Sequence, residues 1–204
     1  MTRSGTSQAT LLSALWPTDA IPAGLRAILL MLAGSAFIAL SAQVQVPLWP
    51  VPMTGQTFAV LIVGVAYGWR LGAATLLLYM AEGAMGIPVF AKAAAGPAVI
   101  MGPTGGYIMG FVLAAAIIGY LAERGWDRNV WSMALAMAIG NVVIYLLGLP
   151  WLALYLAGVG IEQPVAAAIA GGLTPFLLGD ALKLALAACL VPVAWKFMGR
   201  TRRV

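Results

Sequence analysis

The sequence has 204 residues, of which 63% are hydrophobic and only 8% are charged, and its mean hydropathy is +0.99. Because a soluble domain carries roughly 25% charged residues, this composition excludes an ordinary soluble domain and predicts a membrane protein. The chain has no histidine, one cysteine and a net charge of +5 spread over scattered positions, which excludes a disulfide framework and histidine-based catalysis and predicts no metal site, no cofactor and no nucleic-acid partner.

The fold class expected from the sequence is all-α, a single membrane domain over residues 1–204. Residues 1–24 are expected to form a cytoplasmic or interfacial segment, residues 25–198 a bundle of six transmembrane helices, and residues 199–204 a basic cytoplasmic tail. A crossing helix needs about 20 mostly apolar residues. The predicted spans are 26–46, 55–69, 71–85, 104–121, one span within 130–160 that Pro150 bends, and 174–195.

The number of spans depends on whether 55–85 is one helix or two. With six spans and both termini in the cytoplasm, Lys92 is the only basic residue in an external loop. The other basic residues outside the last span then lie inside: Arg3, Arg26, Arg70, Arg124, Arg128, Lys196, Arg200, Arg202 and Arg203. With five spans Arg70 falls within the hydrocarbon, so the positive-inside rule favours six spans.

Three external segments, 47–54, 86–103 and 160–172, hold seven of the 12 proline residues and six of the 24 glycine residues in the chain. Irregular backbone at membrane depth is tolerated only where it is buried in protein or lines a cavity. We therefore expect the first two segments to form a lid or a pocket wall. The third is equally compatible with an ordinary connecting loop.

The last predicted span contains two ionisable residues, Asp180 and Lys183, on one helix face. Counted from Thr174, they lie roughly 9 and 13 Å below the outer surface. Charged residues at that depth face the bundle interior and have partners. One interpretation is an ion pair that only fixes helix packing. The other is a binding site in which Lys183 meets an anionic group and Asp180 accepts hydrogen bonds.

Other polar residues are candidates for the same cavity. Gln56 and Thr57 open the second span, and Glu82 lies near the outer end of the third, where it could also reach the membrane surface. Lys92 is either substrate-facing or solvated. The sequence lacks a P-loop, a dinucleotide fingerprint and a convincing catalytic pair, which predicts a binding or transport protein rather than an enzyme.

Four motifs, in this order, resemble one known family. They are Pro50-Val-Pro-Met-Thr-Gly-Gln-Thr57, Gly83-Ala-Met-Gly-Ile-Pro-Val-Phe90, Gly102-Pro-Thr-Gly-Gly-Tyr107 and Gly179-Asp-Ala-Leu-Lys183. Together they are similar to the BioY family, the biotin-specific substrate-binding (S) components of energy-coupling factor (ECF) transporters. The resemblance runs from about residue 25 to residue 196.

The resemblance implies a six-helix bundle that captures biotin at the external face, with the loop between the first two helices as a lid. It implies that Lys183 receives the biotin carboxylate and that Asp180 contacts the fused-ring end. The further candidate contacts are Gln56, Thr57, Thr54, Glu82, Tyr107 and Lys92. Relatives often carry an asparagine after the Pro-Val-Phe motif, where this chain has Ala91, Lys92 and Ala93.

The resemblance also implies partners: a membrane coupling (T) subunit and ABC-type ATPase subunits, or self-association into a homo-oligomer. Ser35, Ala39 and Ala42 share one face of the first span, and small residues let membrane helices approach closely. This face is expected to dock the coupling subunit, and the alternative is packing within the same bundle. Two other functions stay open, an S component for a different vitamin and a non-transport membrane protein with a structural Asp–Lys pair.

Overall fold

The computed structural model describes residues 10–11 and 22–201, so most of the expected interfacial segment and residues 202–204 of the basic tail lie outside the described residues. Most of the described chain is helical, which confirms the all-α prediction. The elements are α2 (Ala23–Gln43), β1 (Gln45–Val46), β2 (Met53–Thr54), α3 (Gln56–Ala84), η2 (Ala91–Ala93), α4 (Pro97–Met101), α5 (Gly105–Ala122), η3 (Trp126–Arg128), α6 (Val130–Gly158), α7 (Pro164–Gly172) and α8 (Phe176–Thr201).

Five of the described helices, α2, α3, α5, α6 and α8, are long and apolar enough to cross a membrane. Their outward side chains are largely aliphatic; Leu154 and Leu178, for example, are 74% and 75% exposed. Exposed apolar surface of this extent is compatible with lipid as the surrounding solvent and not with water. Cys189 is also exposed on α8; it is small and apolar enough to face lipid.

The α3 helix folds back on itself at Gly68. The side-chain amide of Gln56 donates a 2.6 Å hydrogen bond to the Tyr79 hydroxyl, although a straight helix would separate these residues by about 34 Å. The element is therefore two antiparallel arms. They correspond to the predicted spans 55–69 and 71–85, except that the reversal occurs at Gly68 rather than at Arg70 and without an intervening loop.

Glycine is required at the reversal for two reasons. Gly68 has φ +79°, and a Cβ atom there would lie 2.3 Å from the Glu123 carboxylate. That carboxylate accepts a 3.1 Å hydrogen bond from the backbone N–H of Trp69, which begins the second arm. The end of α5 thus caps the second arm of α3 and fixes the position of the turn.

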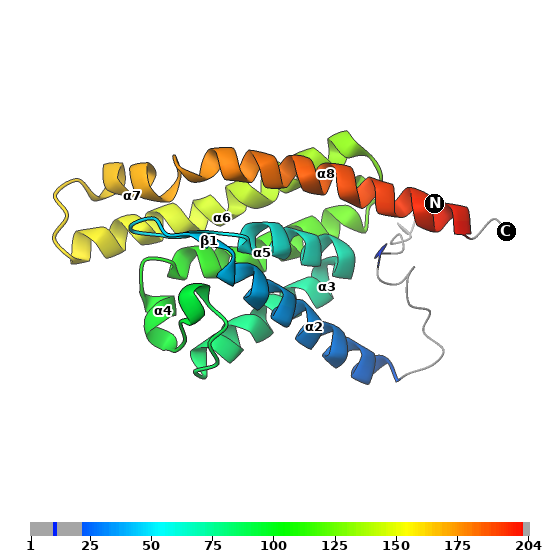
Figure 1. The fold of residues 1–204 in the computed structure, drawn as a ribbon, viewed down its shortest axis with the longest axis horizontal. Coiled ribbons are helices and arrows are strands. Elements are labelled where there is room, and N and C mark those ends of the chain that lie inside the picture. The colour runs from blue at the N-terminus through cyan, green and yellow to red at the C-terminus, as the bar shows by residue number, and fades with distance from the viewer. Residues whose placement is uncertain (1–9, 12–21, 202–204) are drawn as a thin grey trace, which may run out of the picture.

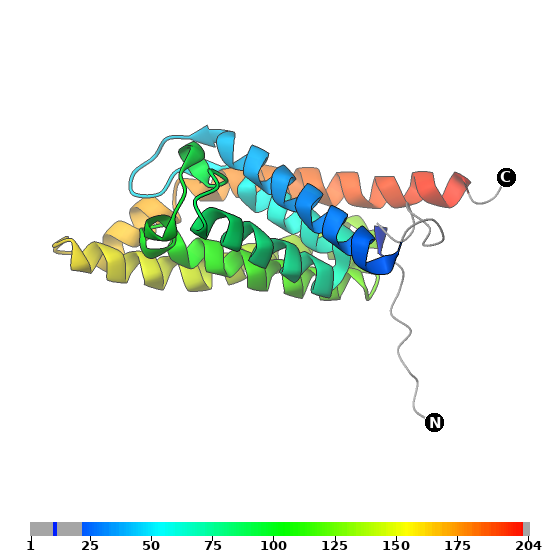
Figure 2. The same ribbon diagram turned by 90° about the horizontal axis from the view of Figure 1, so that it is seen from below.

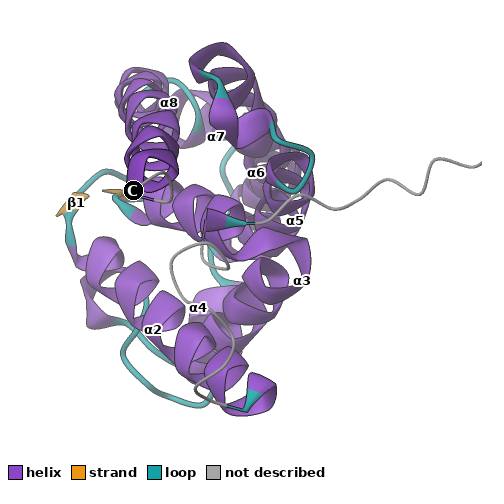
Figure 3. Ribbon diagram, turned by 90° about the vertical axis from the view of Figure 1, so that its right-hand side faces the viewer, coloured by secondary structure: helices purple, strands orange, loops and turns teal. Residues whose placement is uncertain are grey.

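The α5 helix lies at the centre of the bundle, between α3 and α6 (Figure 3). Its glycines allow close approach: a Cβ atom on Gly110 would lie 3.0 Å from the Cα atom of Ile144 in α6. The start of α2 and the end of α8 lie at the same end of the bundle (Figures 1 and 2). The hairpin, α4 and α7 lie at the opposite end.

The segments at this opposite end are more regular than the sequence predicted. In the first connection, β1 pairs antiparallel with β2, with Gln45 opposite Thr54. The second connection contains η2 and α4, and the third, expected as an irregular loop over 160–172, forms α7 from Pro164 onward. The run of alanines after Pro164 explains this difference, because proline is favoured at the first helical position and alanine has the highest helix propensity.

The end of α8 that lies away from the hairpin is attached to η3, which directly precedes α6. Trp195 Nε1 donates a 2.5 Å hydrogen bond to Asp127 Oδ2, and the Arg128 guanidinium lies 4.5 Å from the centre of the Trp195 ring. Asp127 is buried, and burial raises the pKa of its carboxyl although the Trp195 hydrogen bond lowers it. This contact holds the end of the helix that carries Asp180 and Lys183.

Candidate functional site

A cavity of about 200 Å³ lies at the end of the bundle that holds the hairpin. The hairpin, η2, α5, α6 and α8 each contribute side chains to its wall. Its lining is mainly apolar and aromatic, with a few polar groups, which is the usual composition of a small-molecule site. The lining residues used below are Thr54, Gln56, Thr57, Phe90, Lys92, Tyr107, Phe111, Asn141, Tyr145, Phe176, Asp180 and Lys183.

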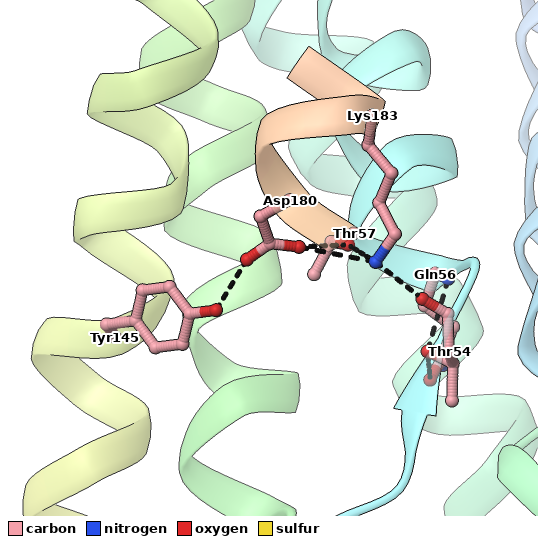
Figure 4. A network of polar contacts seen from close by, with 6 residues as sticks. All are labelled: Thr54, Gln56, Thr57, Tyr145, Asp180 and Lys183. Carbon is pink, nitrogen blue, oxygen red and sulfur yellow. Dashed lines mark hydrogen bonds and ion pairs between the residues drawn. The ribbon is translucent and has the colours of Figure 1, made fainter. Parts of the chain in front are cut away.

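Lys183 has acceptors for all three hydrogens of its ammonium group (Figure 4). Its Nζ atom donates to the Thr54 carbonyl at 2.8 Å, to Thr57 Oγ1 at 2.8 Å and to Asp180 Oδ1 at 3.2 Å. The pair is largely buried, with 20% of the lysine side chain and 6% of the aspartate side chain exposed. The predicted shared face of Asp180 and Lys183 is therefore confirmed, and it faces the cavity.

The Asp180 carboxylate is held from two sides (Figure 4). The Tyr145 hydroxyl of α6 donates to Oδ2 at 2.5 Å, and Thr57 donates to Oδ1 at 3.4 Å. Sequence reasoning missed Tyr145, because an aromatic residue in an apolar span more often packs against its neighbours than meets a carboxylate. The available signal was its polar hydroxyl, which a buried tyrosine usually satisfies with a partner.

Gln56 lines the cavity, but its side-chain amide bonds to other protein groups. Its Nε2 donates to Tyr79, its Oε1 accepts from Thr54 Oγ1 at 3.0 Å, and the Tyr79 hydroxyl donates in turn to the Val89 carbonyl at 2.9 Å. Gln56 therefore joins the hairpin and both arms of α3 to the segment that precedes η2.

Tyr107 and Lys92 also line the cavity. The Tyr107 hydroxyl donates to the Gly172 carbonyl at 3.0 Å, and its ring meets that of Tyr145 edge to face at 6.3 Å. Lys92 has φ 61°, a left-handed conformation that is costly for a residue other than glycine or asparagine. The Gln43 side chain holds this turn, accepting from the Ala93 N–H at 3.0 Å and donating to the Phe90 carbonyl at 3.0 Å.

Glu82 does not line the cavity, which corrects the expectation that it shares the site. Its carboxylate accepts a hydrogen bond from the Ser35 hydroxyl of α2. Glu82 lies on the face of the second α3 arm that packs against α2, so its side chain points toward that helix rather than into the cavity.

The predicted docking stripe on α2 is covered by the chain's own helices. Ser35 and Ala42 are 1% and 0% exposed, and Ala39 is partly buried against the core. A side chain without exposed surface offers nothing for a partner to contact. Ser35 and Ala42 therefore pack within the bundle, the alternative expected from the sequence, whereas Ala39 keeps part of its surface exposed.

Among residues 10–11 and 22–201, no three acidic, histidine or cysteine side chains lie close enough together to hold a metal ion. The cavity wall offers two ammonium groups, those of Lys92 and Lys183, together with one carboxylate, hydroxyl and amide groups, and apolar side chains. These groups can hold a small anionic molecule that also carries hydrogen-bond donors.

The comparisons with known proteins agree with one another. The family model described as "BioY family" matches residues 9–200. The "Biotin transporter BioY" of Thermotoga maritima is 38% identical over 156 residues, which cover 76% of this chain and 88% of that relative. The "Probable biotin transporter BioY" of Pyrococcus horikoshii is 40% identical over 166 residues, covering 81% of this chain and 92% of that relative.

A solved structure has the same fold. It is the crystal structure of "the S-component for biotin from an ECF-type ABC transporter", which matches with a TM-score of 0.70 at 19% identity and covers 87% of this chain and 95% of that one. The family model matches nearly the whole chain, and the relatives named above are 38% and 40% identical to it, which is sufficient to assign the chain to a family. The chain belongs to the BioY family.

Proposed function

We propose that the chain is the biotin-binding S component of an ECF-type transporter and that it is not an enzyme. The observation that carries this proposal is the Lys183–Asp180 pair in the wall of an otherwise mainly apolar cavity. Biotin offers a carboxylate, an apolar thiophane ring and a ureido group. Relatives described as biotin transporters support biotin over a different vitamin.

In this proposal Lys183 receives the biotin carboxylate. All three of its hydrogens are engaged in the structure, so the ligand carboxylate replaces one acceptor. Asp180 is the weakest of the three, at 3.2 Å. Because the carboxylate and the ureido group lie at opposite ends of biotin, Lys183 Nζ moves away from Asp180 in this exchange. Tyr145 and Thr57 keep Asp180 hydrogen-bonded, and its carboxylate then accepts from a ureido N–H.

The apolar part of biotin lies against the aromatic wall formed by Phe90, Phe111 and Phe176. The hairpin supplies both the Thr54 carbonyl to Lys183 and part of the cavity wall, so we propose that it acts as the lid. Lys92, at the rim, contributes electrostatic attraction for the entering carboxylate. Thr54 and Gln56 act chiefly by positioning the hairpin.

For the membrane arrangement we propose six spans, with the two arms of α3 crossing separately and both termini in the cytoplasm of a bacterial cell. Support comes from the basic residues at the end of the bundle where α2 begins and α8 ends: Arg26, Arg70, Arg124, Arg128 and Lys196. Lys92 lies at the cavity end. This asymmetry agrees with the positive-inside rule and opens the cavity outward.

Transport against a gradient needs an energy source, and we propose that a coupling (T) subunit and ABC-type ATPase subunits supply it. Purification of the tagged chain from its native membrane, followed by mass spectrometry of bound ligand and proteins, tests this proposal. Biotin together with paired ATPases is the expected result. A different bound vitamin would overturn the ligand assignment, and recovery of copies of this chain alone would favour a homo-oligomer.

A further inference from the structure

Asn141 on α6 lines the cavity one helical turn before Tyr145. Its Oδ1 atom is buried and, within the part of the chain that the structure describes, accepts no hydrogen bond. Buried polar atoms almost always have a partner, so an amide oxygen left unpaired in a cavity wall indicates a partner that the protein itself does not supply.

The other polar groups of the cavity are already engaged or are of the wrong kind. Both ends of the Gln56 amide bond to protein groups. Both Asp180 oxygens accept hydrogen bonds, from Tyr145 and from Lys183. Lys92 brings donors but no acceptor. Of the two amide side chains that line the cavity, Asn141 is thus the one whose oxygen accepts no hydrogen bond from the described residues.

Asn141 also lies on the same side of the cavity as the carboxylate proposed to meet the ureido group. Asn141, Tyr145 and Asp180 line both the cavity and the adjoining apolar groove between α6 and α8. The three side chains therefore lie where the two spaces adjoin, which places Asn141 on the Asp180 side of the cavity.

A cyclic urea carries an N–H donor on each side of a carbonyl acceptor. A carboxylate can accept from one of these N–H groups but cannot donate to the carbonyl, whereas a carboxamide both accepts and donates. We propose that Asn141 recognises the ureido group, accepting one N–H while Asp180 accepts the other, and that it selects for cyclic ureas. This inference rests on the proposed function and adds a specificity residue to it.

The test compares Asn141→Leu, which keeps the volume and removes the hydrogen-bonding groups, with the wild type. Dissociation constants are measured for biotin, for biotin amide and for the two biotin isomers methylated on either ureido nitrogen. Asn141→Leu should raise the dissociation constants of biotin and of biotin amide by the same factor, about tenfold, which is the effect of losing one buried hydrogen bond. For the isomer whose methyl group blocks the N–H facing Asn141, wild type and variant should differ by less than about twofold.

Val142→Leu is the matched control, because Val142 is adjacent in sequence and 56% exposed; its affinity for biotin should stay at the wild-type value. Thermal unfolding verifies that each variant is folded, and Asn141→Ala replaces the leucine variant if the latter does not fold. Unchanged biotin affinity, or an equal loss for both methylated isomers, would overturn the role of Asn141. A wild-type protein that does not bind biotin would instead overturn the proposed function.

Discussion

Thr57 connects the two charged residues of the cavity, because its hydroxyl accepts from the Lys183 ammonium group and donates to the Asp180 carboxylate. The ion pair is thereby part of a hydrogen-bonded chain that runs from the hairpin to Tyr145 on α6. Such a chain costs less to keep in the membrane than unpaired charges would, since each charge has partners. It can also exchange one acceptor for another when a ligand arrives.

Lys183→Ala should lower the affinity for biotin by more than the ~1.5–3 kcal/mol of one charged hydrogen bond, because it also leaves the buried Asp180 carboxylate without its cation. The wild type should bind biotin amide much more weakly than it binds biotin. The variant should bind the two ligands with about equal affinity. Equilibrium binding to the purified proteins measures both effects.

The double variant Lys183→Ala/Asp180→Asn serves as the control for that experiment, since it removes the ligand contact without leaving an unpaired anion. It should fold better than the single variant and still fail to distinguish biotin from biotin amide. Wild-type affinity of Lys183→Ala for biotin would mean that the pair only packs helices.

At the residue scale the sequence predicted which helix face is charged, because an i, i+3 pair in an apolar helix has one energetically acceptable orientation. The sequence did not predict that Tyr145 and Asn141 line the cavity. Their orientation depends on the rotation of α6 against α5 and α8, and the uniformly apolar sequence of α6 does not specify that rotation. Ser35 and Glu82 were misplaced for the same reason, since the rotation of α2 turns Ser35 toward α3.

At the scale of elements, the reversal of α3 depends on a single residue. Gly68→Ala places a side chain at φ +79° and against the Glu123 carboxylate, so it should lower the free energy of unfolding by about 1–3 kcal/mol. Gly158→Ala is the control, because a Cβ atom there meets nothing within 4 Å. Thermal unfolding in detergent measures both, and equal stability of the two variants would contradict the reversal at Gly68.

The contact between Asp127 and Trp195 predicts a pH dependence. Burial holds the pKa of the folded carboxyl above its ordinary value, so Asp127 makes the folded state less stable as pH rises from the ordinary pKa through the raised one. Asp127→Asn keeps an acceptor for Trp195 and removes that cost. The variant should unfold at a higher temperature than the wild type at neutral pH, and the difference should shrink below about pH 4.

Glu162→Gln removes the same charge from an exposed position and is the control for Asp127→Asn. In this control, the difference in unfolding temperature between neutral and acidic pH should stay near the wild-type value. If Asp127→Asn instead lowers stability at neutral pH, the hydrogen bond from Trp195 to a charged carboxylate outweighs the cost of burial.

Helix boundaries were the most predictable part of the elements. The span predicted at 104–121 corresponds to α5 and that at 130–160 to α6, because glycine, proline and charge mark their ends. The reversal inside α3 was predicted from charge rather than from a turn signal. The β1–β2 pairing was not predicted, since two-residue strands leave no periodic pattern in the sequence. The α7 helix was not predicted either, because its sequence is equally compatible with a loop.

At the scale of the whole molecule, the bundle has one end with basic side chains and one with the cavity. Single cysteines at Ala98 and Lys196, in a Cys189→Ala background, test whether these ends face opposite sides of the membrane. Both positions are exposed, whereas Asp127 is buried and would not report on sidedness. An impermeant thiol reagent applied to intact cells should label the first and spare the second, and the opposite pattern would invert the orientation.

The central claim is that this cavity binds biotin, and isothermal titration of biotin into the purified full-length chain in lipid nanodiscs tests it most directly. We expect saturable binding of one biotin per chain, with heat that is unaffected by an excess of other vitamins, because the carboxylate meets Lys183 and the ureido group meets Asp180 and Asn141. A folded protein that gives no saturable heat with biotin, or that binds another vitamin which biotin cannot displace, would contradict it.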